Sequence, residues 1–449
     1  MPSDGEREVR SRGRGAPPRE RITPIFRHLP RGPHSLDPRE IALHQRVRIE
    51  RAMVEAIAQG GYEQLTVRHV IGLAGVSRRS FYEQFANVHD CFLKTARSVC
   101  ERELARAQVA SRSTSAAVEI VLPQAFATLA AAACERPAPL RLALSESLCA
   151  GDTGAVVLGE ALCACERLLG EQLARSPGEP LPGGILRALS GALHGLLSAG
   201  LREAAPGLPS RLLGEQMCRL ALGQRLPSPA VGEELAMLLR DRSRRAALAA
   251  AMRSGPAPDA IGSRELMLRG AMRLAARRQV SSLNAAEISE EAGVPLDAFL
   301  ESFSDARSCL YEALGTAAEP LLAIGRRAHS STGDWPQAVR LALAGVLGHL
   351  AANNPPAVAL ALVAHRAGPA ARQQSRELEQ SLGAALLGPA PPGAPQAEAV
   401  SGALWHLVRQ AILEQRTRLL PALSDHLAYV LLAPTIGAAE AIEALRVGG

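Results

Sequence analysis

The sequence is poor in aromatic residues and has almost no lysine. Aromatic residues make up 3% of the 449 residues, and the hydrophobic content of 47% comes mainly from Ala, Leu and Val. Little of the chain alternates between polar and apolar residues as strands do, whereas long Ala/Leu segments have helical spacing. The composition therefore predicts an all-α fold, and a chain of this length exceeds what one hydrophobic core usually holds.

Several functional motifs are missing. The eight cysteines include no C-x-x-C pair and there is no H-E-x-x-H segment, so the usual zinc motifs are absent. Phosphate-binding glycine loops and nucleophile elbows are absent as well. No apolar signal core and no charge-free apolar run of membrane-spanning length stands out. We therefore expect a cytoplasmic protein that is not an enzyme and uses no metal or cofactor, with reduced cysteines.

Positive charge is carried almost entirely by arginine. The chain has 50 Lys and Arg residues against 44 Asp and Glu residues, and Lys94 is its sole lysine. This modest excess permits nucleic-acid binding but does not require it. Arginine suits phosphate and guanine contacts, although a GC-rich genome produces the same bias.

Residues 66–85 carry the most informative pattern. Apolar residues recur at helical spacing over 67–74, Gly75 suits a left-handed turn, and Ser77 suits the N-cap of a second helix. Phe81 and Phe85 lie one turn apart and are expected to face the core. The second helix then directs outward Arg78, Arg79, Ser80, Tyr82 and Gln84. This arrangement predicts a helix-turn-helix whose second helix reads DNA.

The sequence around this pattern resembles the TetR/AcrR family of bacterial transcriptional regulators. The resemblance covers residues 45–95 and rests on Gly-Gly-Tyr-x-x-Leu-Thr-Val, Ala-Gly-Val-Ser-x-x-x-Phe-Tyr-x-x-Phe and Asn-x-x-x-Cys-Phe-Leu, with their spacing intact. It implies a three-helix N-terminal domain that binds double-stranded operator DNA. It also implies a larger helical domain that dimerises and often holds an inducer.

The pattern and the resemblance together give a set of DNA-binding residues. These are Thr66, Arg68, Ser77, Arg78, Arg79, Ser80, Tyr82, Gln84 and Lys94. In the family, the positions of Thr66 and Tyr82 usually touch phosphates, and those of the arginines and Ser80 meet base edges or backbone. Gln84 replaces the usual histidine and retains a donor. Val88 stands where the family usually has a phosphate-binding lysine, so Lys94 is included as a partial replacement.

The pattern occurs a second time. Residues 283–310 restate residues 65–92 at a constant offset of 218, and Ser401-Gly-Ala-Leu repeats Ser190-Gly-Ala-Leu. Repetition over such a length indicates a duplicated architecture. We predict two tandem TetR-like units, each with a three-helix, homeodomain-like helix-turn-helix domain followed by a helical regulatory bundle.

The second copy keeps the core pattern and changes the surface. In place of Ser77, Arg78, Arg79, Ser80 and Tyr82 it has Pro295, Leu296, Asp297, Ala298 and Leu300. Residues 45–106 carry ten basic and seven acidic residues, whereas residues 263–324 carry six and nine. Acidic and aliphatic side chains are poor partners for phosphates and base edges. The second helix-turn-helix is therefore predicted to be degenerate, and the first to bind DNA specifically.

The predicted domains follow from these patterns. They are a disordered basic arm (1–38), a helix-turn-helix DNA-binding domain (39–95), a helical regulatory and dimerisation domain (96–225), a connector (226–262), a degenerate helix-turn-helix domain (263–313) and a second helical regulatory domain (314–449). The arm is rich in Arg, Pro and Gly, a composition that does not bury a core. It either remains a solvated tail or follows a DNA groove.

The predicted function is sequence-specific transcriptional regulation, with repression preferred and release by a small hydrophobic effector. Two assemblies fit: an intramolecular pseudo-dimer with one working head, or a homodimer that brings two heads to a palindrome. The larger number of phosphate contacts favours the homodimer. The alternative function is a ligand-sensing or interaction scaffold whose helix-turn-helix units no longer bind DNA. Salt-dependent DNA binding would distinguish the two functions.

Overall fold

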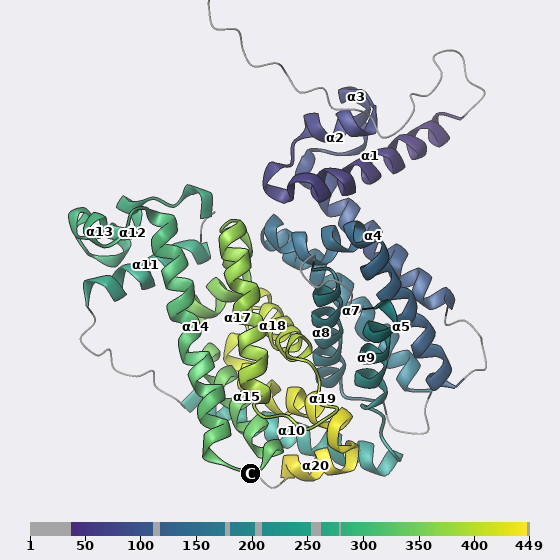
Figure 1. The fold of residues 1–449 in the computed structure, drawn as a ribbon, viewed down its shortest axis with the longest axis vertical. Coiled ribbons are helices and arrows are strands. Elements are labelled where there is room, and N and C mark those ends of the chain that lie inside the picture. Colours follow the sequence, from purple (N-terminus) through teal and green to yellow (C-terminus); the bar gives the residue numbers. More distant parts are fainter. Residues whose placement is uncertain are drawn as a thin grey trace, which may run out of the picture.

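The computed structural model describes residues 37–110, 117–175, 180–202, 209–252, 262–277 and 280–446. Over these residues the chain is built of helices and turns and has no strand (Figure 1). The predicted all-α fold class is therefore confirmed. The predicted basic arm lies outside the described residues except for its last two positions.

The first domain is formed at the N-terminal end of the described chain. Its elements are α1 (Pro38–Gly60), the 3-10 segment η1 (Tyr62–Gln64), α2 (Val67–Ala74), α3 (Arg78–Gln84) and the beginning of α4 (Val88–Ala110). Gly61 ends α1 with a φ of 66°, and Gly75 ends α2 with a φ of 61°. Glycine is favoured at both positions because a Cβ is strained in this conformation. The helix expected over 67–74 coincides with α2, and α3 begins directly after the expected cap Ser77.

A helical bundle follows this domain. It comprises α5 (Val118–Glu135), α6 (Pro137–Leu140), the π-helical segment η2 (Arg141–Ser145), the 3-10 segment η3 (Glu146–Ala150), α7 (Asp152–Leu173), α8 (Gly183–Gly200) and α9 (Ser210–Leu222). Helix α6 begins at Pro137, where the missing N–H of proline costs no intrahelical hydrogen bond.

Helix α10 (Pro229–Met252) leads into the second half. It packs on the C-terminal helices, where Arg242 Nε lies 2.6 Å from an Asp425 carboxylate oxygen and Ser243 Oγ donates to the Ala422 carbonyl at 2.6 Å. The connector predicted over 226–262 is thus largely one helix. Its described part packs against the second half of the chain.

The second half follows the same order of elements as the first. Its elements are α11 (Ser263–Arg277), η4 (Val280–Ser282), α12 (Ala285–Ala292), α13 (Leu296–Ser302), α14 (Ala306–Ser331), α15 (Trp335–Ala352), α16 (Asn354–Val358), η5 (Ala359–Val363), η6 (Ala364–Arg366), α17 (Pro369–Leu387), α18 (Ala397–Leu413), η7 (Thr417–Leu423), α19 (Ser424–Ile436) and α20 (Ala438–Arg446). Segment η5 is π-helical like η2, and both follow a short helix that contains proline. Gly151 and Gly368, which precede α7 and α17, both have positive φ angles, of 82° and 105°.

The two halves lie side by side and meet along α8 and α18 (Figure 1), the most extensive contact between two helices in the described chain. The contact is backbone against backbone. A Cβ added to Gly191 would lie 2.9 Å from the Gly402 carbonyl oxygen, and one added to Gly402 would lie 2.6 Å from the Gly191 carbonyl oxygen. The glycines in the middle of these helices therefore have a packing reason that offsets their low helix propensity.

Within the described part of the chain, two segments are long and apolar enough to cross a membrane by length and composition: Val118–Glu135, which is α5, and Thr417–Ile436, which joins η7 and α19. Both pack within the helical structure, α5 against α9 and α4, and α19 against α15, α20 and α8. In α19, the run Leu427–Ala433 is buried throughout. A helix that is apolar on all sides is expected in such a core position.

Candidate DNA-binding site

The outer face of α3 presents a cluster of polar side chains on a rigid base. Phe81 and Phe85 are fully buried, so they fix the helix against the domain core. Arg79 points away from it with 89% of its side chain exposed, and Tyr82 is 46% exposed. The guanidinium carbon of Arg78 lies 5.6 Å from the centroid of the Tyr82 ring, a cation–π distance. These three side chains are accessible to a ligand as large as a DNA duplex.

The hydroxyls at the starts of α2 and α3 act as helix caps. Thr66 Oγ1 accepts from the His69 backbone N–H at 3.2 Å. Ser77 Oγ accepts from the Ser80 backbone N–H at 3.0 Å and lies 2.9 Å from Ser80 Oγ. Arg68 is exposed on the first turn of α2. The predicted N-cap role of Ser77 is confirmed.

The guanidinium of Arg79 forms only a weak ion pair, with Glu83. Its Nε lies 2.9 Å from a carboxylate oxygen of Glu83, and both side chains are mostly exposed. Exposed ion pairs of this kind contribute about 0–1 kcal/mol. A phosphate or a guanine edge can therefore replace Glu83 at little cost.

Gln84 and Lys94 have partners inside the domain. Gln84 Nε2 lies 3.4 Å from the Ala42 carbonyl oxygen on α1, and Lys94 Nζ lies 2.9 Å from an Asp90 carboxylate oxygen. Although burial alone raises the pKa of Asp90, its hydrogen bonds with Lys94 and the Ala86 N–H lower it overall. Lys94 also lies 5.6 Å from the centroid of the Phe85 ring. These two residues differ from the other predicted contacts because each already holds elements of the domain together.

Arg48 is a structural member of this site that the sequence pattern does not reveal. Its Nε and Nη2 atoms lie 3.1 and 2.8 Å from the carbonyl oxygen of Ala74, the last residue of α2. The guanidinium thus satisfies a carbonyl that the helix end leaves without an intrahelical partner. Arg48 connects α1 to the turn before α3, so it positions the helix-turn-helix.

A chain of polar contacts joins the domain to the bundle below it. Tyr62 O–H and His89 Nδ1 are 2.6 Å apart, and His89 Nε2 lies 3.0 Å from Thr153 Oγ1 at the start of α7. The Tyr62 backbone N–H also donates to a Glu146 carboxylate oxygen at 3.1 Å. These contacts connect η1 and α4 of the first domain to η3 and α7 of the bundle.

The second half of the chain also touches the first domain. Arg372 on α17 forms an ion pair with Glu63 on η1, with Nη1 and Oε1 2.7 Å apart. The same Nη1 lies 3.8 Å from Cys149 Sγ. Burial raises the pKa of the Cys149 thiol to about 12, so it remains protonated at neutral pH. Arg372 thus bridges both halves at the base of the domain.

The second helix-turn-helix has the same framework and a different surface. Asn284 caps α12, Gly293 has a φ of 67°, and Phe299 is buried, as their counterparts are. The outer face of α13 carries no basic residue, and its exposed apolar residues include Leu300, which is 57% exposed. This face has no donor for a phosphate comparable to the arginines of α3.

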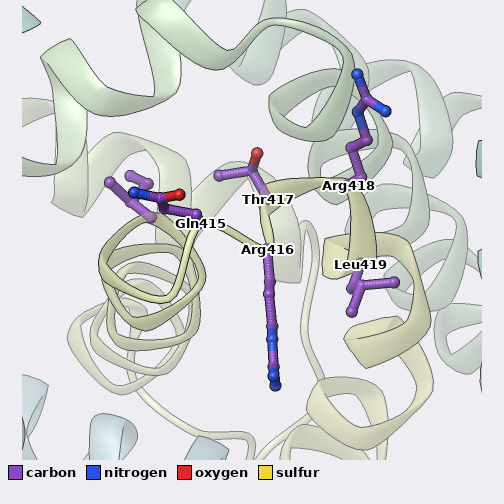
Figure 2. A pocket seen from close by; sticks show the side chains of 6 residues that line it. Gln415, Arg416, Thr417, Arg418 and Leu419 are labelled. Carbon is purple, nitrogen blue, oxygen red and sulfur yellow. The ribbon is translucent and has the colours of Figure 1, made fainter.

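An open hollow of about 680 Å³ lies at the turn between α18 and η7, lined by Ile412 and residues 415–419. Figure 2 shows that the side chains of Arg416 and Arg418 point in opposite directions from this turn. The two guanidinium groups therefore do not converge on one ligand. The hollow is remote in sequence from α3 and adds nothing to the candidate DNA-binding surface.

The comparisons with known proteins bear on the first domain. No curated protein matches the chain significantly. Residues 49–94, which extend from the middle of α1 into α4, match the family model described as bacterial regulatory proteins, tetR family. This match, together with the exposed polar face of α3, supports a DNA-binding transcriptional regulator of the TetR type.

Proposed function

We propose that the protein is a sequence-specific transcriptional regulator, preferentially a repressor, with one DNA-reading head. In this proposal α3 enters the major groove, Arg78 and Arg79 reach base edges or phosphates, and Thr66, Arg68 and Tyr82 contact the backbone. The observation that carries the proposal is the exposed Arg–Tyr face held on the buried phenylalanines of α3. We also propose that the protein acts in the cytoplasm and that its domains have the boundaries predicted from the sequence.

The proposed pairing of heads is intramolecular. Helices α8 and α18 hold corresponding positions in the order of elements, and they pack together within one chain. Arg202 with Glu398 and His406 with Glu166 add polar contacts across the same boundary, each at 3.3 Å. Because α8 is already covered by α18 of the same chain, we favour an intramolecular pseudo-dimer. The larger number of phosphate contacts favours the alternative, a homodimer. Such a protein recognises a single half-site rather than a palindrome.

The number of phosphate contacts gives a measurable expectation. A single head with about four or five phosphate contacts is expected to give a slope near −4 in a plot of log affinity against log salt. Fluorescence anisotropy with DNA selected from a random pool measures this slope. Binding without salt dependence, or no selection of any sequence, would favour the interaction-scaffold alternative. A slope about twice as steep would indicate two heads on the DNA.

The ion pair between Arg372 and Glu63 is expected to position the reading head. Arg372→Ala should weaken operator binding by about two- to fivefold, because a partly exposed ion pair contributes about 1 kcal/mol or less. Glu63→Gln should have a similar effect, and the double variant should be no worse than either single one. Arg326→Ala, at an exposed position of α14, is the matched control. Additive losses would show that the two residues act separately.

A further inference from the structure

The outer face of α13 exposes two leucines at the positions where α3 exposes an arginine and a tyrosine. Leu296 and Leu300 lie one turn apart and correspond to Arg78 and Tyr82 at the offset of 218. Leu296 is 42% exposed, and Leu300 is exposed further. Adjacent exposed apolar side chains rimmed by polar ones are typical of an interaction surface. The second half therefore keeps an outward-facing helix at this place but gives it a different chemistry.

Two acidic side chains accompany these leucines. Asp297 and Glu301 lie one turn apart on α13, and both are exposed. Within the described part of the chain, neither of them forms an ion pair. Like charges four residues apart on a helix repel each other. A partner that brings positive charge to this face would relieve the repulsion.

The charge of this face excludes several partners. Residues 279–306 contain six acidic residues and no Lys or Arg. The phosphates of nucleic acids and of anionic lipids have the same sign of charge and are repelled. The α13 face of another chain would bring the same acids and is repelled as well. The complementary partner is therefore a basic protein surface with an exposed apolar or aromatic side chain.

The outer face of α3 is such a surface within the same chain. Residues 61–88, which correspond to 279–306, contain three arginines and two acidic residues. These arginines, Arg68, Arg78 and Arg79, are all exposed, and the ring of Tyr82 is accessible beside Arg78. Of the possible pairings between the two helix-turn-helix domains, here called heads, only α3 with α13 joins opposite charges.

The positions of the heads allow a closed pair of chains. Both heads lie toward the end of the molecule opposite α20, one at each side (Figure 1). Two chains that meet head to head about a two-fold axis place α3 of each against α13 of the other, so the same contact forms twice. Each contact is small beside the ~1,600 Å² of a standard interface. The second contact forms within the pair, however, and strengthens the association.

We propose that α13 is a docking surface for α3 of a second copy of this chain, so that two chains without DNA cover each other's reading helices. The acids Asp297 and Glu301 pair with the arginines of α3, and Leu300 packs against Tyr82. The pairing itself needs no DNA, whereas its competition with DNA rests on the proposed function. Because salt screens exposed charges, the pair dissociates to the monomer at high ionic strength.

Sedimentation velocity of the full-length chain without DNA tests the pairing. We expect a concentration-dependent dimer at about 30 mM salt and the monomer at about 300 mM salt. The pairing of α8 with α18 is therefore assessed at the higher salt, where the heads do not associate. Asp297→Arg/Glu301→Arg should weaken self-association by about tenfold or more, because two positive faces then meet. The control Glu233→Arg/Glu440→Arg, at exposed positions of α10 and α20, changes the net charge equally and should have no effect.

The reversed variant of the other face provides the complementary measurement. Arg78→Glu/Arg79→Glu should also weaken self-association by about tenfold or more, because both of its heads are then negative. In a mixture with Asp297→Arg/Glu301→Arg, each negative head meets a positive one. Association should then return to within about threefold of the wild type. All four positions are exposed, and thermal unfolding of each variant verifies that it folds.

The proposal is overturned if the wild-type chain stays monomeric at low salt, if either reversed variant pairs like the wild type, or if the mixture does not associate. Operator DNA should dissociate the pair, and a pair that persists with every α3 occupied by DNA also contradicts the contact. A chain that pairs but binds no DNA refutes the proposed function alone. A chain that binds DNA and never pairs refutes this inference alone.

Discussion

The double substitution Arg78→Ala/Arg79→Ala is expected to reduce the affinity for selected operator DNA by about 10²- to 10⁴-fold. Each lost base or phosphate contact from an arginine costs roughly 1–3 kcal/mol, and each 1.4 kcal/mol corresponds to about tenfold. Both side chains extend from the outer face of α3. Among the described residues, their side-chain contacts are those with Tyr82 and Glu83 on the same helix, so their removal is expected to leave the core unchanged. A gel shift with DNA selected from a random pool measures the loss.

The matched control is Leu296→Ala/Asp297→Ala on α13. These positions correspond to Arg78 and Arg79 at the offset of 218, and both are exposed. Operator affinity should change by less than about twofold, because neither side chain offers a donor to DNA. Equal losses from the two double variants would mean that both helix-turn-helix domains read DNA, and would contradict the single-head proposal.

The framework of the reading head could be predicted from sequence because its determinants are local. A cap at Ser77, a left-handed turn at Gly75 and phenylalanines one turn apart act within a few residues of one another. The role of Gln84 was harder to predict. Gln84 depends on a carbonyl of α1 that lies 42 residues away in sequence. No local pattern reports such a partner.

The contrast between local patterns and partners distant in sequence also explains which features of the second half could not be predicted. An arginine and a tryptophan on an Ala/Leu-rich helix are compatible with either a solvated edge or a core position. Only the packing of the bundle shows that both side chains are buried and that the indole N–H of Trp405 has no hydrogen-bond partner. Likewise, Arg372 reaches Glu63 across 309 residues of sequence. Contacts between the halves depend on how the bundles dock, and residue spacing does not encode that information directly.

The asymmetry between the halves is consistent with a division of roles. The first half has the arginine face on α3 and a neutral His194–Ser198 pair in its bundle. The second half has an acidic and aliphatic face on α13 and, on α18, the buried indole N–H of Trp405 without a hydrogen-bond partner. The Arg372 ion pair joins the second bundle to the first head. We propose that the second bundle supports the orientation of the first head through this ion pair, which the Arg372→Ala variant tests.

Gly195→Ala is expected to destabilise the protein, whereas Gly159→Ala should stabilise it. Both glycines lie inside helices, so removing backbone freedom from the unfolded chain favours the folded state by about 0.5–1 kcal/mol in each case. A Cβ at Gly159 on α7 meets nothing within 4 Å. A Cβ at Gly195 on α8 collides with the carbonyl oxygen of Glu398 on α18, and backbone cannot move aside as a side chain can.

The collision at Gly195 should lower the free energy of unfolding by about 1–3 kcal/mol, the usual cost of overpacking. Urea unfolding of the two alanine variants gives the opposite signs directly. Light scattering measures the oligomeric state. A chain that covers α8 with its own α18 should remain a 47.3 kDa monomer. A wild-type dimer that dissociates in Gly195→Ala would mean that α8 pairs between chains, and would contradict intramolecular pairing. A stable monomer in both forms, with stability lost only at Gly195, is the result expected of two halves joined along α8 and α18.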